Sequence, residues 1–241
     1  MRLLSRLRPG AVVVLPSVER LASIVVPSKY PDIFDTCRAS VNLYATDAPK
    51  ILVRDGQDII PPPGWTTIQG PDEPFIYARN VNLGIKACTG DVLLMNDDVK
   101  FYNEKTLETL QGVLSLHPEI GILSPLVDGV ANGVGYTREA VQVTSHYLSF
   151  VCVLIRRAVI DKIGLLDESF TGYGSEDVDY CRRAQAAGFS LAVTALSTVQ
   201  HTHGSTSYTR EADIEAKRQA SAQQYLQKWG RKTQGYYSDE Q

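Results

Sequence analysis

The sequence predicts a single α/β domain, Rossmann-like, whose central sheet is mostly parallel and flanked by helices. Short apolar runs typical of buried strands alternate with stretches of helical spacing, which is the pattern of βαβ units. The chain of 241 residues with 44% hydrophobic content is long enough for one full core. Three successive predicted strands end in polar residues, and ligands of open α/β sheets bind beyond the carboxyl ends of the strands.

The elements follow from apolar runs for strands and from apolar residues every three to four positions for helices. Strands are expected at 22–28, 50–56, 66–70, 91–101, 120–125 and 190–195. Helices are expected at 30–46, 76–90, 103–118, 176–188 and 210–229, and residues 149–168 are expected to form a strand followed by a short helix. Residues 126–139 have the composition of a loop. We divide the chain into an N-terminal extension at 1–21, the α/β domain at 22–209 and a C-terminal helix with a polar tail at 210–241.

Charge and cysteine content exclude several classes of protein. The formal net charge of −3 argues against a dedicated nucleic-acid binder, which usually carries a basic face. The four cysteines form no Cys-x-x-Cys pair, so they predict buried thiols in a reducing cytosol. The apolar run near the N-terminus, Ala11 to Leu15, is too short for a signal peptide or a membrane span. We therefore expect a cytoplasmic protein that is soluble or peripheral to the membrane.

The stretch "NDDV" at 96–99 places two aspartates at a predicted strand end. Burying both carboxylates without a partner costs several kcal/mol per charge, and a bound divalent cation would offset this cost. Hard oxygen ligands suit Mg²⁺ or Mn²⁺, and either ion can bridge to phosphates. The alternative is a solvated turn whose aspartates cap the helix that starts near Asn103.

The stretch "HTHG" at 201–204 places two histidines two residues apart, so both point the same way from an extended chain. Alone, this pattern is typical of a surface loop. Beside the acidic strand end, His201 or His203 becomes a candidate metal ligand, and an imidazole favours Mn²⁺ over Mg²⁺.

The stretch "GYGSEDVDYCRR" at 172–183 delivers Glu176 and Asp177 to a helix N-terminus. Backbone amides and the helix dipole keep a carboxylate ionised there, as a general base requires. The alternative is an ordinary helix start with Ser175 as N-cap and acidic residues in the first turn. Asp179 lies inside the helix, where Arg182 or Arg183 can pair with it.

Taken together and in this order, these motifs resemble those of the family 2-like glycosyltransferases of the GT-A fold, and more closely their rhamnosyltransferase-like branch. The resemblance covers roughly residues 22–206 and rests on the combination of motifs, since each one is weak alone. The segments that carry it are "SIVVPS" at 23–28, "LVRDGQD" at 52–58, "ARNVNLGIKACTGDVLLMNDDV" at 78–99, the acidic segment at 154–189 and "VQHTHGST" at 199–206.

The resemblance implies roles for individual residues of this chain. Nucleotide-sugar binding falls to Pro27, Ser28, Asp55, Asn82 and Asp97. The last aspartate of the Asp-x-Asp-like element, Asp98, would ligate the metal together with a histidine of the turn, His201 aligning better than His203. Asp177 would be the catalytic base, with Glu176 beside it. Asn96 stands where many members have an aspartate, and a neutral amide binds a divalent ion less well.

The activity implied is inverting transfer of a sugar from a UDP-, dTDP- or GDP-linked donor to a hydroxyl acceptor, assisted by a divalent cation. The acceptor is left open by the sequence: polysaccharide, protein or modified nucleic acid. One alternative is a nucleotidyltransferase, but the basic, glycine-rich phosphate loop expected of that class is missing from "PSKYPDIFD" at 27–35. A second alternative is a catalytically silent module that binds a nucleotide sugar.

Overall fold

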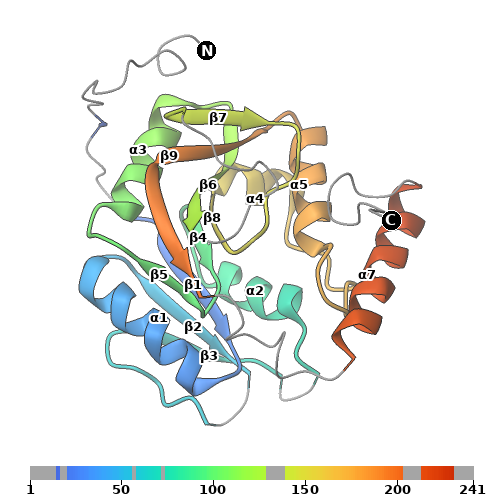
Figure 1. The fold of residues 1–241 in the computed structure, drawn as a ribbon, viewed down its shortest axis with the longest axis horizontal. Helices are drawn as coiled ribbons and strands as arrows, with labels where there is room; N and C mark the ends of the chain where they lie inside the picture. The colour runs from blue at the N-terminus through green and yellow to red at the C-terminus, as the bar shows by residue number, and fades with distance from the viewer. Residues whose placement is uncertain are drawn as a thin grey trace.

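The computed structural model describes residues 15–16, 21–55, 58–71, 74–128, 139–202 and 213–230. Over these ranges, one mixed sheet of nine strands runs in the order β3-β2-β1-β4-β8-β6-β9-β5, with β7 paired to β9 (Figure 1). The strands are β1 (Ser23–Ser28), β2 (Lys50–Arg54), β3 (Thr66–Gln69), β4 (Val92–Met95), β5 (Val99–Phe101), β6 (Ile120–Asp128), β7 (Val141–Thr144), β8 (Cys152–Ile155) and β9 (Ser190–His201). The helices are α1 (Pro31–Tyr44), α2 (Tyr77–Lys86), α3 (Thr106–Leu116), α4 (Arg157–Ile163), α5 (Glu176–Ala186) and α7 (Ile214–Trp229).

The two halves of the sheet differ in strand direction. Strands β3, β2, β1 and β4 are parallel, as the alternating pattern predicts. In the other half, β8 is antiparallel to both β4 and β6, and β9 is parallel to β6 but antiparallel to β5 and β7. A helical crossover between neighbouring strands imposes a parallel pair. No helix lies between β6 and β8 in the part of the chain that the structure describes, so the chain can reverse there.

The single strand expected at 91–101 is divided into β4 and β5. Its polar residues Asn96, Asp97 and Asp98 form a turn, in which the Val99 amide donates to the Asn96 carbonyl at 3.2 Å. The turn redirects the chain, so β5 pairs with β9 at the far end of the sheet order instead of continuing β4.

Both faces of the sheet are buried, which matches the near-continuous apolar runs of the strands. Alternate residues of β1 enter different clusters: Ile24 and Val26 pack with α1 and α3, whereas Val25 packs with α2, α4 and α5. Helix α2 approaches β1 closely at Gly84, where a side chain would collide with Val25. The sheet is therefore held between two helical layers, and its strand ends are fixed by packing on both sides (Figure 1).

Helix α7 lies beside α5 at the edge of the domain (Figure 1). Its Tyr225 is buried with Phe170 and Val178 in a small third cluster. Among the described helices, none combines the length and the apolar character needed to cross a bilayer.

Candidate active site

Three strand ends converge, as expected from their polar residues. The Ser28 hydroxyl, at the end of β1, donates to Oδ2 of Asp97, in the turn that follows β4, at 2.6 Å. The Asp55 amide, just after β2, donates to the Ser28 carbonyl at 2.8 Å. Pro27 is buried on β1 opposite Val53 of β2, one residue before Ser28. The residues that the sequence assigns to nucleotide binding on β1, β2 and β4 thus lie side by side.

Helix α2 contributes Asn80, and not the predicted Asn82, to the strand ends. Asn80 Nδ2 donates to Asp55 Oδ2 at 2.7 Å, and Asp55 is 1% exposed. The Arg79 guanidinium lies 3.8 Å from the same carboxylate oxygen. Neither Arg79 nor Asn80 is among the residues predicted from the sequence, although both belong to the motif that contains Asn82.

Asn82 is placed differently from the sequence prediction. Its Nδ2 donates to the Leu166 carbonyl and to Glu168 Oε1, both at 2.9 Å, and its Oδ1 accepts from the Leu166 amide at 2.9 Å. The carboxamide is therefore used to hold residues 166–168, and Asn80 is the asparagine that contacts Asp55. Side chains two positions apart on a helix point about 200° apart, so the two asparagines serve different regions.

The candidate metal ligands come together where β5 pairs with β9. His201 lies opposite Val99 in that pairing, and the Thr202 amide donates to the Asp98 carbonyl at 3.0 Å. His201 Nε2 lies 3.0 Å from Asp98 Oδ2. The other predicted ligand, His203, lies outside the described residues.

These residues fit a divalent cation. Asp98 is 2% exposed, and within the described ranges its Oδ1 accepts no hydrogen bond. A buried carboxylate oxygen in that state is costly, and one imidazole with one carboxylate is a suitable partial ligand set for Mn²⁺. The described part of the chain contains no group of three or more His, Cys, Asp or Glu side chains that could hold a metal. A cation here would therefore need further ligands, of which a diphosphate can supply two.

Asp97 occupies a different environment from its neighbour. Its pKa is raised to about 7, mainly by burial and in part by the adjacent Asp98 charge, whereas the Ser28 hydrogen bond lowers it. The hydroxyl contact orients Asp97 toward the end of β1, while Asp98 faces His201. The two aspartates thus divide between the predicted nucleotide site and the predicted metal site.

Glu176 and Asp177, here called the acid pair, form the first turn of α5. Asp177 is 4% exposed and accepts from the Val178 amide at 2.8 Å and the Phe150 amide at 3.4 Å. Ser175 occupies the N-cap position, but its side chain makes no capping bond, and it adopts a left-handed φ of 77°. A non-glycine residue in that region is strained, which is typical of a functional turn and differs from the ordinary capped helix.

Burial raises the pKa of both members of the acid pair. For Asp177, backbone N–H groups counteract part of the burial effect, because they stabilise the charged form. For Glu176, the neighbouring Asp177 charge adds to the burial effect. The two backbone N–H donors therefore favour a negative charge on Asp177, which is the protonation state a base needs.

Tyr77, the first residue of α2, connects the acid pair to the strand ends. Its hydroxyl lies 3.0 Å from Asn96 Oδ1 and 3.0 Å from the Phe150 carbonyl. Burial raises its pKa well above the ordinary value, and the next contributions come from Glu176, Asp177 and Asp97. The acidic groups predicted separately from two motifs therefore act on the pKa of one phenol, which the sequence did not single out.

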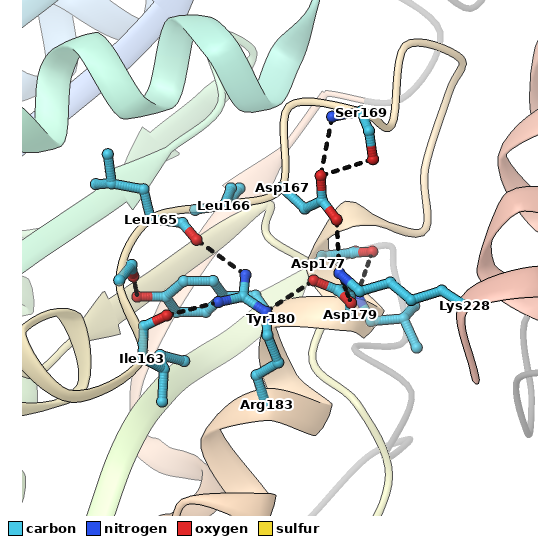
Figure 2. A network of polar contacts seen from close by, with 12 residues as sticks. Ile163, Leu165, Leu166, Asp167, Ser169, Asp177, Asp179, Tyr180, Arg183 and Lys228 are labelled. Atoms are coloured by element: carbon cyan, nitrogen blue, oxygen red, sulfur yellow. Dashed lines mark hydrogen bonds and ion pairs between the residues drawn. The ribbon is translucent and has the colours of Figure 1, made fainter.

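Asp179 belongs to the support of this site. Its Oδ2 pairs with Arg183 Nε at 2.9 Å, which confirms the expected helical partner. Its Oδ1 lies 2.7 Å from Lys228 Nζ and accepts from Trp229 Nε1 at 2.9 Å. Figure 2 shows Arg183 and Lys228 reaching this carboxylate from opposite directions.

Comparison with known proteins identifies the family to which the chain belongs. Residues 77–222, more than half of the chain, match the family described as glycosyltransferase like family 2. The O-antigen biosynthesis protein RfbC of Myxococcus xanthus is 28% identical over 200 residues, which cover 69% of this chain. The chain spans only 15% of the length of that relative.

Solved structures share the fold. The mannosyltransferase PcManGT from Pyrobaculum calidifontis, in complex with GDP-Man and Mn²⁺, matches with a TM-score of 0.66 and 13% identity over 90% of this chain and 66% of its own. TarS of S. aureus matches with a TM-score of 0.60 and 16% identity, covering 86% and 70%. GalNAc-T7 with UDP, GalNAc and Mn²⁺ matches with a TM-score of 0.60 and 12% identity, covering 76% and 44%. These likenesses confirm the GT-A fold predicted from the sequence.

Proposed function

The chain belongs to glycosyltransferase like family 2, and on that premise we propose that it transfers a sugar from a nucleotide-diphosphate donor to a hydroxyl acceptor with inversion. The observation that carries this proposal is a chain of contacts through Tyr77: its hydroxyl lies 3.0 Å from Asn96 Oδ1, beside Asp97, and 3.0 Å from the carbonyl of Phe150, whose amide donates to Asp177. A donor on the strand ends would therefore lie within reach of a base at the start of α5.

The donor would occupy the carboxyl ends of β1, β2 and β4. Ser28, Asp55 and Asp97 present hydroxyl and carboxylate groups there, with Asn80 holding Asp55 in place. Carboxylates in this position accept hydrogen bonds from a nucleobase or from ribose hydroxyls. We assign Asn82 to holding the loop at Leu166, since its carboxamide is fully used there.

Asp98 and His201 would hold a divalent cation, for which we favour Mn²⁺ because of the imidazole. When bound, the cation would neutralise charge that develops on the departing nucleoside diphosphate. Two of the similar solved structures were determined with Mn²⁺, one with UDP and the other with GDP-Man, which supports this choice of donor class.

Asp177 would accept the proton of the acceptor hydroxyl as its oxygen attacks the anomeric carbon. The bond from that carbon to the diphosphate breaks, and the electron pair leaves with the nucleoside diphosphate. A single displacement from the opposite face inverts the anomeric centre and needs no covalent nucleophile. Proton transfer to a positioned base contributes about 10²- to 10⁴-fold.

A donor panel tests the function as a whole. The 241-residue chain with Mn²⁺ is incubated with UDP-, dTDP- and GDP-linked sugars, and donor hydrolysis and melting temperature are measured. We expect at least one donor to be hydrolysed and to raise the melting temperature. A silent binding module would show the temperature shift without hydrolysis, and absence of both for every donor would refute donor binding.

The base is tested by Asp177→Asn with the donor found in the panel. We expect turnover to fall by about 10²-fold or more while the dissociation constant of the donor stays within about twofold. Asp161→Asn is the matched control, because Asp161 is an exposed partner of Arg157 on α4. Lost donor binding in Asp177→Asn would place Asp177 in the donor or metal site instead.

A further inference from the structure

The segment that leads to the acid pair is held at seven consecutive residues. This segment begins at the end of α4 and continues through the α4–α5 loop, residues 164–175. Arg183 donates to the carbonyls of Ile163 and Leu165 at 2.9 Å each, and the Tyr180 hydroxyl donates to the Gly164 carbonyl at 3.0 Å. These contacts come from α5, the helix that the loop precedes (Figure 2).

The next residues of the loop are held from two other helices. Asn82 of α2 binds Leu166 and Glu168, as described above. Helix α7 binds the residues between and after them: Lys228 Nζ lies 2.6 Å from Asp167 Oδ2, and Gln224 Nε2 donates to the Ser169 hydroxyl at 2.7 Å. Loop residues 166–169 therefore alternate between contacts from opposite sides.

Helix α7 also packs closely on the second half of the loop. A side chain at Gly172 would collide with the Lys217 carbonyl and the Ser221 hydroxyl, so only glycine allows this approach. The Tyr173 amide donates to the Lys217 carbonyl at 3.3 Å. Phe170 is buried against Tyr225 of the same helix. The loop thus follows α7 up to the turn that precedes the acid pair.

Lys228 has a special position among these contacts. Its ammonium lies 2.6 Å from Asp167 and 2.7 Å from Asp179, and the acid pair lies between these two residues in the chain. The Asp179 side chain is fully buried, and Lys228, Arg183 and the Trp229 indole are its polar partners. Lys228 lies beyond residue 222, where the match to the family ends.

We propose that Lys228 is a positioning residue for the base: by joining Asp167 and Asp179, it fixes α7 on the α4–α5 loop and thereby holds Glu176 and Asp177 toward the donor site. The division predicted from the sequence places residues 210–241 outside the α/β domain. The contacts of Lys228 with Asp167 and Asp179 instead make α7 a structural part of the site. The inference rests on the proposed function for its catalytic consequence, but the restraint on the loop can be measured without any substrate.

Hydrogen exchange on the full chain tests the restraint. In Lys228→Met, which keeps the length of the side chain but removes the charge, we expect amides within residues 165–176 to exchange about tenfold faster, since a hydrogen bond to a charged group contributes about 1.5 kcal/mol or more. The amides of β1 and β2 should keep their protection. Lys162→Met is the matched control, because Lys162 Nζ donates to the Ala187 carbonyl at the other end of α5. Unchanged exchange in Lys228→Met overturns the proposal.

Kinetics with a donor identified in the panel test the positioning role. We expect kcat of Lys228→Met to fall about tenfold while KM for the donor stays within about twofold, and Lys228→Arg to restore most of kcat because it keeps a cation with several donors. Faster loop exchange with unchanged kcat, or a loss confined to donor KM, would contradict positioning of the base. If wild-type protein acts on no donor, the proposed function fails, and the exchange result alone decides whether Lys228 holds the loop.

A milder variant covers the case in which Lys228→Met does not fold. Trp229→Phe removes the indole N–H bond to Asp179 but keeps a ring beneath the Arg182 guanidinium, whose carbon lies 4.0 Å from the Trp229 ring centroid. We expect the same loop amides to exchange about threefold faster. Unchanged exchange in a folded Trp229→Phe protein would contradict the role of α7 contacts at Asp179.

Discussion

The proposed donor site at the ends of β1, β2 and β4, here called the donor end (Ser28, Asp55, Asp97 and the adjacent Asp98), and the acid pair are held in place by different means. On the donor end, Ser28 ends β1, Asp55 directly follows β2, and Asp97 lies two residues after β4, so the register of the sheet fixes their positions. The acid pair follows a long loop instead, and its position depends on side chains from α2, α5 and α7. One region is placed by backbone pairing and the other by tertiary side-chain contacts.

The two regions also differ in how completely their polar groups are used. Around the α4–α5 loop, Asn82 and Asp179 have both polar atoms of their side chains bonded. At the donor end, by contrast, Asp98 Oδ1 is buried without a hydrogen bond from any described residue. Fully bonded groups provide rigidity, whereas an unused buried oxygen is suited to a ligand. Substitutions in the two regions should therefore have separable effects.

The largest effect is expected at the donor end, from Asp98→Asn. The amide removes the charge that a cation needs but keeps the size of the side chain beside His201, so the melting temperature of metal-free protein should change little. Affinity for Mn²⁺ in the presence of UDP or GDP should fall by at least about tenfold, measured by calorimetry, since even outer-shell losses reach that size.

Asp128→Asn is the matched control, because Asp128 is exposed and accepts only from the Tyr102 hydroxyl among the contacts described, at 2.7 Å. If Asp98→Asn binds Mn²⁺ as wild type does, Asp98 is no metal ligand. A large loss of metal-free stability would instead show that the carboxylate acts mainly through its contact with His201.

A smaller effect, on both regions at once, is expected from Tyr77→Phe. The hydroxyl contacts Asn96, beside Asp97, and the carbonyl of Phe150, whose amide donates to Asp177. Loss of its bonds to Asn96 and Phe150 should lower stability by about 1 kcal/mol, or about 3 °C in melting temperature. Donor affinity and kcat should both fall, each several-fold. Tyr102→Phe removes an exposed hydroxyl as a control. A loss in only one parameter would show that Tyr77 serves one region alone.

The sequence predicted the donor end better than the support of the acid pair, for a physical reason. Apolar runs reveal strands, and the polar residues that follow parallel strands must meet at one edge of the sheet. Ser28, Asp55 and Asp97 could therefore be grouped without coordinates. His201 could be joined to Asp98 only through the order of motifs, because the pairing of β5 with β9 follows from a turn at Asn96–Asp98 that periodicity does not show.

The support of the acid pair could not be derived in the same way. Its contacts join residues far apart in the chain, such as Lys228 with Asp167 and Asn82 with Leu166, and no local pattern encodes such partners. Asn80 and Asn82 are equally polar and share one motif, so the choice between them depends on how α2 is rotated against the sheet. Only Asp179 with Arg183 was predictable, because it is a helical pair four residues apart.

The effect of Glu176→Gln should depend on pH and should be the smallest of the three in acid solution. Burial and the Asp177 charge raise the pKa of Glu176 from its ordinary 4.5 to about 8. A raised folded-state pKa contributes stability below the unfolded value that is lost as pH rises through the folded value. Glutamine stays neutral throughout. The melting temperature of Glu176→Gln minus that of wild type should therefore be near zero at pH 5 and reach a few degrees at pH 8.5, in metal-free protein followed by calorimetry.

Glu108→Gln distinguishes this effect from a general change in net charge. Glu108 is exposed on α3, so the same substitution there removes no buried charge, and its difference from wild type should stay flat across the pH range. A flat difference for Glu176→Gln as well would mean that Glu176 is charged in the folded protein at neutral pH. The acid pair would then carry two negative charges. That result would contradict the proposal that Glu176 is neutral and that Asp177 carries the single charge.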